Sequence, residues 1–259
     1  FSPRVLGNLG LSYEELKAIK PDVIVASLSA YGHDGPWANI PGIGGTIEPT
    51  SGMSALLGYA DGQPLNSGQM YPDAVAGLYG FSAIMTALHH RDRTGEGQYI
   101  AIGMLDTQAA WLSIQAMNYL VGGANPQRLG NGHPNIVPYQ VFPTADGHIM
   151  LTIGNDTLFQ RFCEFAGCSE LASDERFTTN GKRVGNRDAL IEKMKPVLAS
   201  KPSQVWLTEL EKLTIGCGPI NTVEQVFADP HVIDRGMKIE MPHDAIGGRP
   251  VPLVANPIR

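Results

Sequence analysis

The sequence has little of several features that would place a protein in a specialised class. Hydrophobic residues make up 43% and charged residues 17% of its 259 residues. No apolar run approaches the roughly 20 residues that a membrane helix needs. The net charge is -6, so there is no excess of lysine and arginine with which to bind a phosphate backbone. We therefore expect an ordinary globular protein that binds neither membranes nor nucleic acids.

Cysteine is scarce, and Cys163, Cys168 and Cys217 form no CxxC pair. Three thiols are too few for a disulfide framework, and no signal-like segment follows Phe1. Both observations favour a reducing, cytoplasmic location, with the thiols buried as small hydrophobic groups. The seven histidines include no HExxH motif and no cluster with cysteine at zinc spacing, so we expect no metal.

Three familiar catalytic or nucleotide-binding motifs are also missing. The segment 42–45 (GIGG) is not a dinucleotide fingerprint, because GxGxxG would require glycine at Ile47. There is no Walker A sequence for binding nucleotide phosphates. There is also no GxSxG sequence of the kind that carries a serine nucleophile. Any catalytic group must therefore be sought elsewhere.

The first half of the chain alternates helical and strand patterns. Ser12 and Glu15 have the spacing of a capping box, which predicts a helix over 13–19. The apolar run 23–28 predicts a strand buried on both faces of a parallel sheet, and 98–104 predicts a second strand. The order predicts an α/β fold.

Two further helices are predicted in this half, separated by the second strand. Asp73 is expected to open a helix that runs to about Arg91, with small residues at Gly77, Gly80, Ala83 and Ala87 along one side. Asp106 is expected to cap another helix over 107–121. The small side of the first helix predicts that another element packs very close to it.

The composition changes to glycine, asparagine and proline over 122–135, which is typical of a domain boundary. The turn Ala145-Asp146-Gly147 between two apolar runs predicts a hairpin, and helical patterns follow it. These patterns indicate a small α+β domain. We assign residues 1–128 to the large domain, 129–229 to a linker and the small domain, and 230–259 to a segment that returns to the large domain.

Asp73 is the strongest candidate for covalent chemistry. It follows a glycine-rich loop and opens a helix, whose dipole favours an ionised carboxylate. An ionised carboxylate that is partly removed from water is a competent nucleophile toward a thioester carbonyl. Glycines nearby would let backbone N–H groups approach the oxyanion that forms. The competing interpretation is that Asp73 only caps its helix, which is the commoner role of an aspartate at such a position.

The segment Gly130-Asn131-Gly132-His133 is a second candidate. Its two glycines suit a mobile lid whose backbone amides bind an anion or cover an intermediate. As a bare pattern it is more often a simple turn.

Motifs across nearly the whole chain, in order, resemble those of CoA-transferase family III, also called the formyl-CoA transferase or CaiB/BaiF family. These motifs are FSPRVLGNLGLSYEEL, PDVIVASLSAYGHDGPW, YPDAVAGLYG, RDRTGEGQYI, GNGHPNIVPYQVFPTADG and CGPINTVEQVFADP. The resemblance implies the family fold, with a Rossmann-like large domain and a small α+β domain, in which two chains form an interlaced homodimer. It also implies that the protein is an enzyme whose substrates are an acyl-CoA and a small carboxylic acid. Family members carry an earlier and a later segment that we do not recognise in this chain.

The resemblance also implies roles for particular residues. The family's nucleophilic aspartate corresponds to Asp73, and its glycine loop, which shields covalent intermediates, to 130–133. The coenzyme A pocket corresponds to Phe1, with Val5 and Leu9 following on the same face. The implied reaction transfers coenzyme A through an aspartyl-CoA thioester and mixed anhydrides, without ATP or metal. The stretches NIVPYQVF and GPINTVEQVFADP most resemble members that use succinyl-CoA and dicarboxylate acceptors.

Two alternatives remain open. The same family includes α-methylacyl-CoA racemase, whose reaction needs two opposed acid or base groups. Alignment places Ile43, which cannot transfer a proton, where that enzyme has a histidine, although His33 lies nearby in the sequence. The other alternative is a subunit that binds coenzyme A without catalysis, against which the presence of Asp73 counts.

Overall fold

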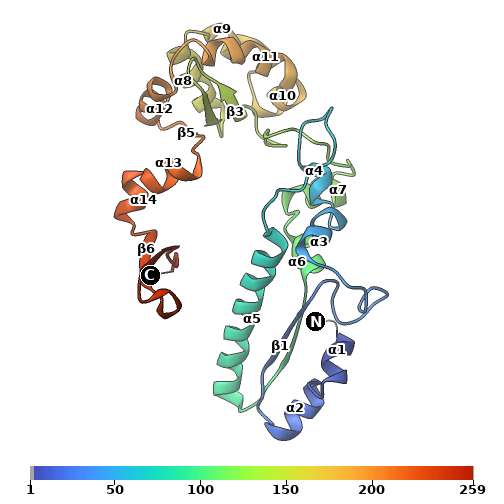
Figure 1. The fold of residues 1–259 in the computed structure, drawn as a ribbon. Helices are drawn as coiled ribbons and strands as arrows, with labels where there is room; N and C mark the ends of the chain where they lie inside the picture. The colour runs from blue at the N-terminus through green and yellow to red at the C-terminus, as the bar shows by residue number, and fades with distance from the viewer. Residues whose placement is uncertain (1–2, 259) are drawn as a thin grey trace. The chain divides into compact units, whose positions relative to one another are not determined.

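The computed structural model describes residues 3–258, and the chain forms two compact units, one up to residue 134 and one from residue 135 on (Figure 1). The first unit contains a parallel pair of strands, one long helix and several short helices. Its elements are α1 (Pro3–Asn8), α2 (Tyr13–Ile19), β1 (Val25–Ser29), α3 (Gly44–Thr50), α4 (Met53–Leu56), α5 (Tyr71–Thr94), β2 (Tyr99–Gly103), α6 (Met104–Ala110) and α7 (Ile114–Leu120).

The predicted start of α2 is confirmed in atomic detail. The Ser12 hydroxyl accepts from the Glu15 backbone N–H at 3.4 Å, and the Glu15 carboxylate accepts from the Ser12 N–H at 3.0 Å. Hydrogen bonds from Ser12 lower the pKa of the Glu15 carboxyl. Such reciprocal capping satisfies two backbone donors that the helix itself leaves free.

From β1 the chain runs through α3, α4 and the long helix α5 to β2. The two strands pair in parallel, from Val25 opposite Tyr99 to Ser29 opposite Gly103. The small side of α5 packs on the strands only in part: a β-carbon on Gly80 would make an ordinary contact, at 3.6 Å, with both Leu28 and Ile102, whereas Gly77 is exposed and has no neighbour within 4 Å of such a β-carbon. The very close approach predicted for this side is therefore not found at Gly77 or Gly80.

The prediction that the first strand is buried on both faces is wrong. Leu28 is 39% exposed although it packs on Gly80, whereas Ser27 and Ser29 are buried. The reason is the width of the sheet: in the described part of the chain only β2 pairs with β1. A two-stranded sheet cannot cover an apolar strand as a wide parallel sheet does.

The single helix predicted over 107–121 is also wrong, because α6 and α7 are separate. Ser113 has φ +48°, which lies outside the helical range and interrupts the hydrogen-bond ladder between them. Asp106 does not cap α6, whose N-cap is Gly103; it lies within the first turn, and its carboxylate contacts Gly103.

The second unit has a three-stranded antiparallel sheet in the order β3-β4-β5, which confirms the predicted hairpin around Asp146. Its core includes the buried side chains of Phe142, Leu151, Phe159 and Trp206. The elements up to β5 are β3 (Tyr139–Pro143), β4 (His148–Thr152), α8 (Asp156–Ala166), α9 (Ser169–Ser173), α10 (Asn180–Gly185), α11 (Arg187–Leu198), α12 (Ser203–Lys212) and β5 (Gly216–Pro219).

The chain then continues through two short helices, α13 (Val223–Ala228) and α14 (Pro230–Asp234), into a second hairpin. In this hairpin β6 (Lys238–Pro242) pairs antiparallel with β7 (Pro250–Val254). That this segment returns to the large domain stays a prediction, as do the two boundaries between the three assigned segments.

The cysteines behave as small hydrophobic groups. Cys163 and Cys168 are buried where α8 ends at Gly167, and the Cys168 N–H donates to the Cys163 carbonyl at 2.9 Å. This is the backbone pattern of a Schellman motif, in which the two flanking side chains meet. Burial raises the pKa of the half-buried Cys217 thiol, which keeps it protonated and unreactive at neutral pH.

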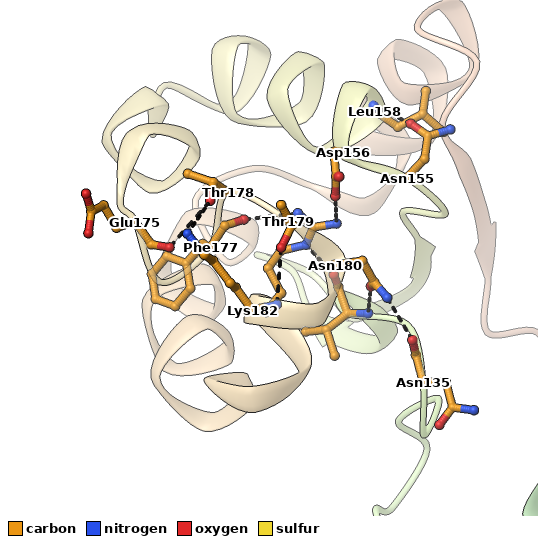
Figure 2. A network of polar contacts seen from close by, with 12 residues as sticks. Asn135, Asn155, Asp156, Leu158, Glu175, Phe177, Thr178, Thr179, Asn180 and Lys182 are labelled. Atoms are coloured by element: carbon orange, nitrogen blue, oxygen red, sulfur yellow. Dashed lines mark hydrogen bonds and ion pairs between the residues drawn. The ribbon is translucent and has the colours of Figure 1, made fainter. Parts of the chain in front are cut away.

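A fully buried arginine organises the start of the second unit. The Arg183 guanidinium donates to the carbonyls of Val137 at 2.7 Å and Phe177 at 3.0 Å, and to the Asp156 carboxylate at 2.8 Å. Asn180, one turn earlier, accepts from the Val137 N–H and donates to the Asn135 carbonyl; Figure 2 shows Asn180 and Asn135 side by side. The two side chains therefore fasten 135–137, directly after the glycine-rich segment.

We expect Arg183→Met to destabilise the second unit by about 2–5 kcal/mol, because buried carbonyls lose their charged donor. Urea unfolding followed by tryptophan fluorescence reports this unit through the buried Trp206. Arg176→Met is the matched control, since Arg176 is exposed and its ion pair with Asp174 lies at the surface. Equal unfolding midpoints for the two variants would contradict the assigned role of Arg183.

Candidate active site

Asp73 lies in the first turn of α5, as its third residue. The N-cap of α5 is Met70 and Pro72 is the second helical residue, so the interpretation of Asp73 as a simple cap is wrong. Proline suits this position because its missing N–H has no partner in a first turn. The Asp73 side chain is exposed.

The Asp73 carboxylate packs directly on the backbone of Gly44, the first residue of α3. A β-carbon built on Gly44 would overlap the carboxylate oxygen Oδ2. Gly44 is buried, whereas the next residue, Gly45, is exposed and has no neighbour within 4 Å of such a β-carbon. Glycine at position 44 therefore lets the backbone approach the carboxylate more closely than any other residue would allow.

The short helices of this unit surround that contact. α3 packs on α5 and on α6, and α4 follows α3 directly. Figure 1 shows α3, α4, α6 and α7 gathered around the end of α5 at which Asp73 lies. The carboxylate thus stands where several helices of the first unit meet.

The glycine-rich segment is tied to the connection between α4 and α5. The Gly130 N–H donates to the Gly58 carbonyl at 3.0 Å, and its Cα faces the Tyr59 ring. The Arg128 guanidinium donates to the carbonyls of Tyr59 at 3.1 Å and Gly62 at 2.8 Å.

The backbone of the glycine-rich segment turns at its two glycines. Gly130 has φ +62°, a conformation that glycine adopts without strain. The Gly132 N–H closes a turn onto the Leu129 carbonyl at 2.9 Å.

The three residues predicted to bind coenzyme A differ in what the structure shows of their surroundings. Val5 lines a cavity of about 360 Å³ together with residues at the carboxyl ends of β1 and β2, the edge of a parallel sheet at which ligands characteristically bind. Leu9 is 60% exposed, and Phe1 lies outside the described residues. The cavity is lined by Val5, Leu28, Ser29, Ala30, Ala38, Asn39, Ile40, Pro41, Gly42 and Met104.

The importance of Gly44 was not evident from the sequence, in which 42–45 was considered only as a dinucleotide motif. In the structure this segment lies between the cavity and the carboxylate: Gly42 lines the cavity, and Gly44 contacts Asp73. The feature of the sequence that could have indicated it is the pair of adjacent glycines, Gly44 and Gly45, with which this short helix begins. Only the fold reveals which of the two lies against the carboxylate.

The groups that a racemase would need are arranged unfavourably. Ile43 is the N-cap of α3, beside Gly44, and its side chain is 70% exposed. His33 lies instead on the sheet, where its Nε2 is 2.9 Å from the Ser27 carbonyl and its Nδ1 is 3.0 Å from the Tyr99 hydroxyl. Both ring nitrogens are thus engaged by protein groups.

The described residues include neither a membrane-spanning helix nor a cluster of metal-binding side chains. Between residues 3 and 258 no helix is long and apolar enough to cross a membrane. Over the same part of the chain, no three His, Cys, Asp or Glu side chains gather closely enough to hold a metal ion.

The chain is similar to several characterised proteins. It is 40% identical to the succinate–glutarate CoA-transferase of Agrobacterium fabrum over 253 residues, which are 98% of this chain and 63% of the relative. It is 35% identical to the human succinyl-CoA:glutarate CoA-transferase over 252 residues, 97% of this chain and 58% of the relative. A crystal structure of a CAIB/BAIF family protein from Brucella suis matches with TM-score 0.82 and 42% identity, covering 100% of this chain and 67% of that one.

The sequence profile of CoA-transferase family III matches residues 1–259. The chain belongs to this family. It spans about 60% of the length of the curated relatives that it matches. The expected family and α/β fold class are therefore confirmed.

Proposed function

We propose that the protein is a CoA-transferase that moves coenzyme A from an acyl-CoA donor to a dicarboxylic acid acceptor, with succinyl-CoA as the donor and a short dicarboxylate such as glutarate as the acceptor. The observation that carries the proposal is the exposed Asp73 carboxylate held against Gly44 at the start of α5. The family membership and the substrates named for the Agrobacterium and human relatives support the reaction and the acids.

The reaction begins when an Asp73 oxygen attacks the thioester carbonyl of the donor. This forms an aspartyl–acyl anhydride and releases the coenzyme A thiolate. The thiolate then attacks the aspartyl carbonyl, which forms an aspartyl-CoA thioester and releases the donor acid. Each bond formed replaces an activated acyl bond of similar energy, so no ATP is consumed.

The second half of the cycle reverses these steps with the new acid. The acceptor carboxylate attacks the aspartyl-CoA thioester, giving a new anhydride and again the thiolate. Attack of the thiolate on the acceptor carbonyl forms the product acyl-CoA and restores the Asp73 carboxylate. In this cycle Asp73 gains and loses an acyl group, and no proton transfer by a protein side chain is required.

We assign coenzyme A binding to the cavity lined by Val5, with Phe1 and Leu9 contributing from the same N-terminal segment. A volume of about 360 Å³ suits part of so long a substrate. We assign protection of the intermediates to the glycine loop, residues 130–133, because an anhydride or thioester exposed to water would be hydrolysed.

The experiment that tests the proposal is mapping of a covalent adduct on the full-length enzyme. Incubation with succinyl-CoA alone, followed by intact mass measurement and peptide mapping, should reveal a coenzyme A adduct on Asp73. Hydroxylamine should remove it, and glutarate should discharge it to glutaryl-CoA. An adduct on another carboxylate would overturn the assignment of Asp73, and no transfer to any carboxylate would overturn the function.

The glycine loop is expected to gate water and not to supply a catalytic side chain. Gly130→Ala should lower turnover and increase hydrolysis of succinyl-CoA relative to transfer, because alanine is strained at φ +62° and its methyl group meets the Tyr59 ring. His133→Ala should keep transfer within about tenfold, or about 1.4 kcal/mol of barrier. The measurement is the ratio of free coenzyme A released to product acyl-CoA formed. Loss of transfer in His133→Ala as complete as in Asp73→Ala would make His133 an acid or base group.

We further propose that the full-length protein is an interlaced homodimer that works in the cytoplasm. Sedimentation at low concentration should show a dimer that separates only on unfolding, since interlaced chains cannot part while folded. A folded monomer would contradict this assembly.

A further inference from the structure

A buried carboxylate on α3 has no part in the chemistry proposed above. Glu48 is only 2% exposed, although charged side chains are rarely buried without a partner. Among the ion pairs of residues 3–258, none involves Glu48. Its carboxylate oxygen Oε1 instead accepts from the backbone N–H of Ser67 at 2.7 Å. A separation of 2.7 Å is that of a well-formed hydrogen bond.

Glu48 and Gly44 lie on the same face of α3. The buried residues of this helix are Gly44, Ile47 and Glu48, at the spacings of three and four that define one face. Gly44 contacts the Asp73 carboxylate, and Glu48, one turn further on, holds Ser67. One rigid helix thus carries both the surface on which Asp73 rests and a fastening for the chain that leads to Asp73.

A second fastening acts on the neighbouring residue. The Asn66 side chain accepts from the Ser54 hydroxyl of α4 at 2.6 Å and donates to the Gly45 carbonyl of α3 at 3.2 Å. The Ser67 hydroxyl then accepts from the Gln69 N–H at 3.2 Å, just before the N-cap of α5. Residues 66 and 67 are therefore bound to α3 and α4, and Ser67 in turn holds Gln69, which directly precedes the N-cap of α5.

We infer that Glu48 is a positioning residue for Asp73: by holding the Ser67 N–H, it fixes the start of α5 on α3 so that the Asp73 carboxylate stays against Gly44. The inference rests on the proposed function, in which Asp73 is the nucleophile. A nucleophile must be held close to its attacking geometry, and a displacement of about 1 Å can cost about a hundredfold in rate. What matters in this role is the acceptor oxygen of residue 48 and not its charge.

The test compares substitutions in the full-length enzyme. Glu48→Gln keeps an acceptor of the same shape, Glu48→Met keeps the length but removes the acceptor, and Thr50→Val is a control on the exposed side of α3. The measurement is the rate at which succinyl-CoA forms the Asp73 adduct, together with the succinyl-CoA concentration for half-maximal rate. Hydrogen exchange of the peptide over 62–70 in the free enzyme provides a readout that needs no activity.

For Glu48→Met we expect adduct formation about 10- to 100-fold slower, half-saturation within about threefold of wild type, and faster exchange over 62–70. Glu48→Gln and Thr50→Val should stay within about threefold of wild type in rate. A wild-type rate in Glu48→Met would overturn the inference. Glu48→Gln as slow as Glu48→Met would also overturn it, because the charge would then be the required property.

Two further outcomes are decisive. If Glu48→Met does not fold, Asn66→Ala removes the exposed fastening of the same segment and should slow adduct formation about tenfold; an unchanged rate would overturn the inference. If the wild-type enzyme forms no adduct on Asp73, the proposed function fails. In that case exchange over 62–70 still decides whether residue 48 holds this segment.

Discussion

Asp73→Asn is expected to reduce CoA transfer at least about a thousandfold while the protein stays folded. The amide that replaces the carboxylate cannot attack a thioester, and a missing nucleophile is not compensated by the rest of a site. The structural cost should be small, because Asp73 is exposed and does not cap α5. Loss of its interaction with the helix dipole costs about 0.3–1 kcal/mol. The measurements are steady-state transfer from succinyl-CoA to glutarate and the thermal unfolding midpoint.

Asp188→Asn is the control for this substitution. Asp188 is an exposed aspartate in the first turn of α11, so it loses a similar interaction with a helix dipole in the second unit. It should keep wild-type transfer. Asp73→Asn that retains a tenth of the wild-type transfer rate would show that another group carries the covalent step.

Gly44→Ala is expected to reduce adduct formation about a hundredfold. Its methyl group would overlap the Asp73 carboxylate, so the carboxylate must turn away from α3 or the two helices must separate. A displacement of this kind is costly for a reaction that depends on near-attack geometry. The folded state should lose little stability, because alanine is a better helix former than glycine.

Gly45→Ala provides a closely matched comparison one residue along. A β-carbon at position 45 would meet no atom within 4 Å, and the residue is exposed on the same short helix. It gains the same helix propensity without touching Asp73. Equal adduct rates for Gly44→Ala and Gly45→Ala would mean that the contact between Gly44 and Asp73 has no bearing on catalysis.

Local sequence patterns predicted many elements of this fold closely. The capping box at Ser12, the hairpin around Asp146 and the amphipathic helix α8 depend on interactions between residues close in the chain. Such interactions leave a readable spacing in the sequence. The family resemblance rested on motifs spread along the chain, and the family profile confirms it.

Other features were decided by packing between distant segments. The exposure of Leu28 follows from the width of its sheet, which the local pattern does not record. Propensity is a weak guide where tertiary contacts compete with it.

For the candidate site, the sequence by itself determined which residue types are available: an aspartate at the start of a long helix, a glycine-rich loop and no metal-binding motif. Only the tertiary structure decided that Asp73 rests on Gly44 and that Glu48 holds the segment leading to it. These partners lie 29 and 19 residues apart in the chain, as their numbers show. No periodicity of a helix or strand relates such distances, so the contacts exist only after α3 and α5 have packed together.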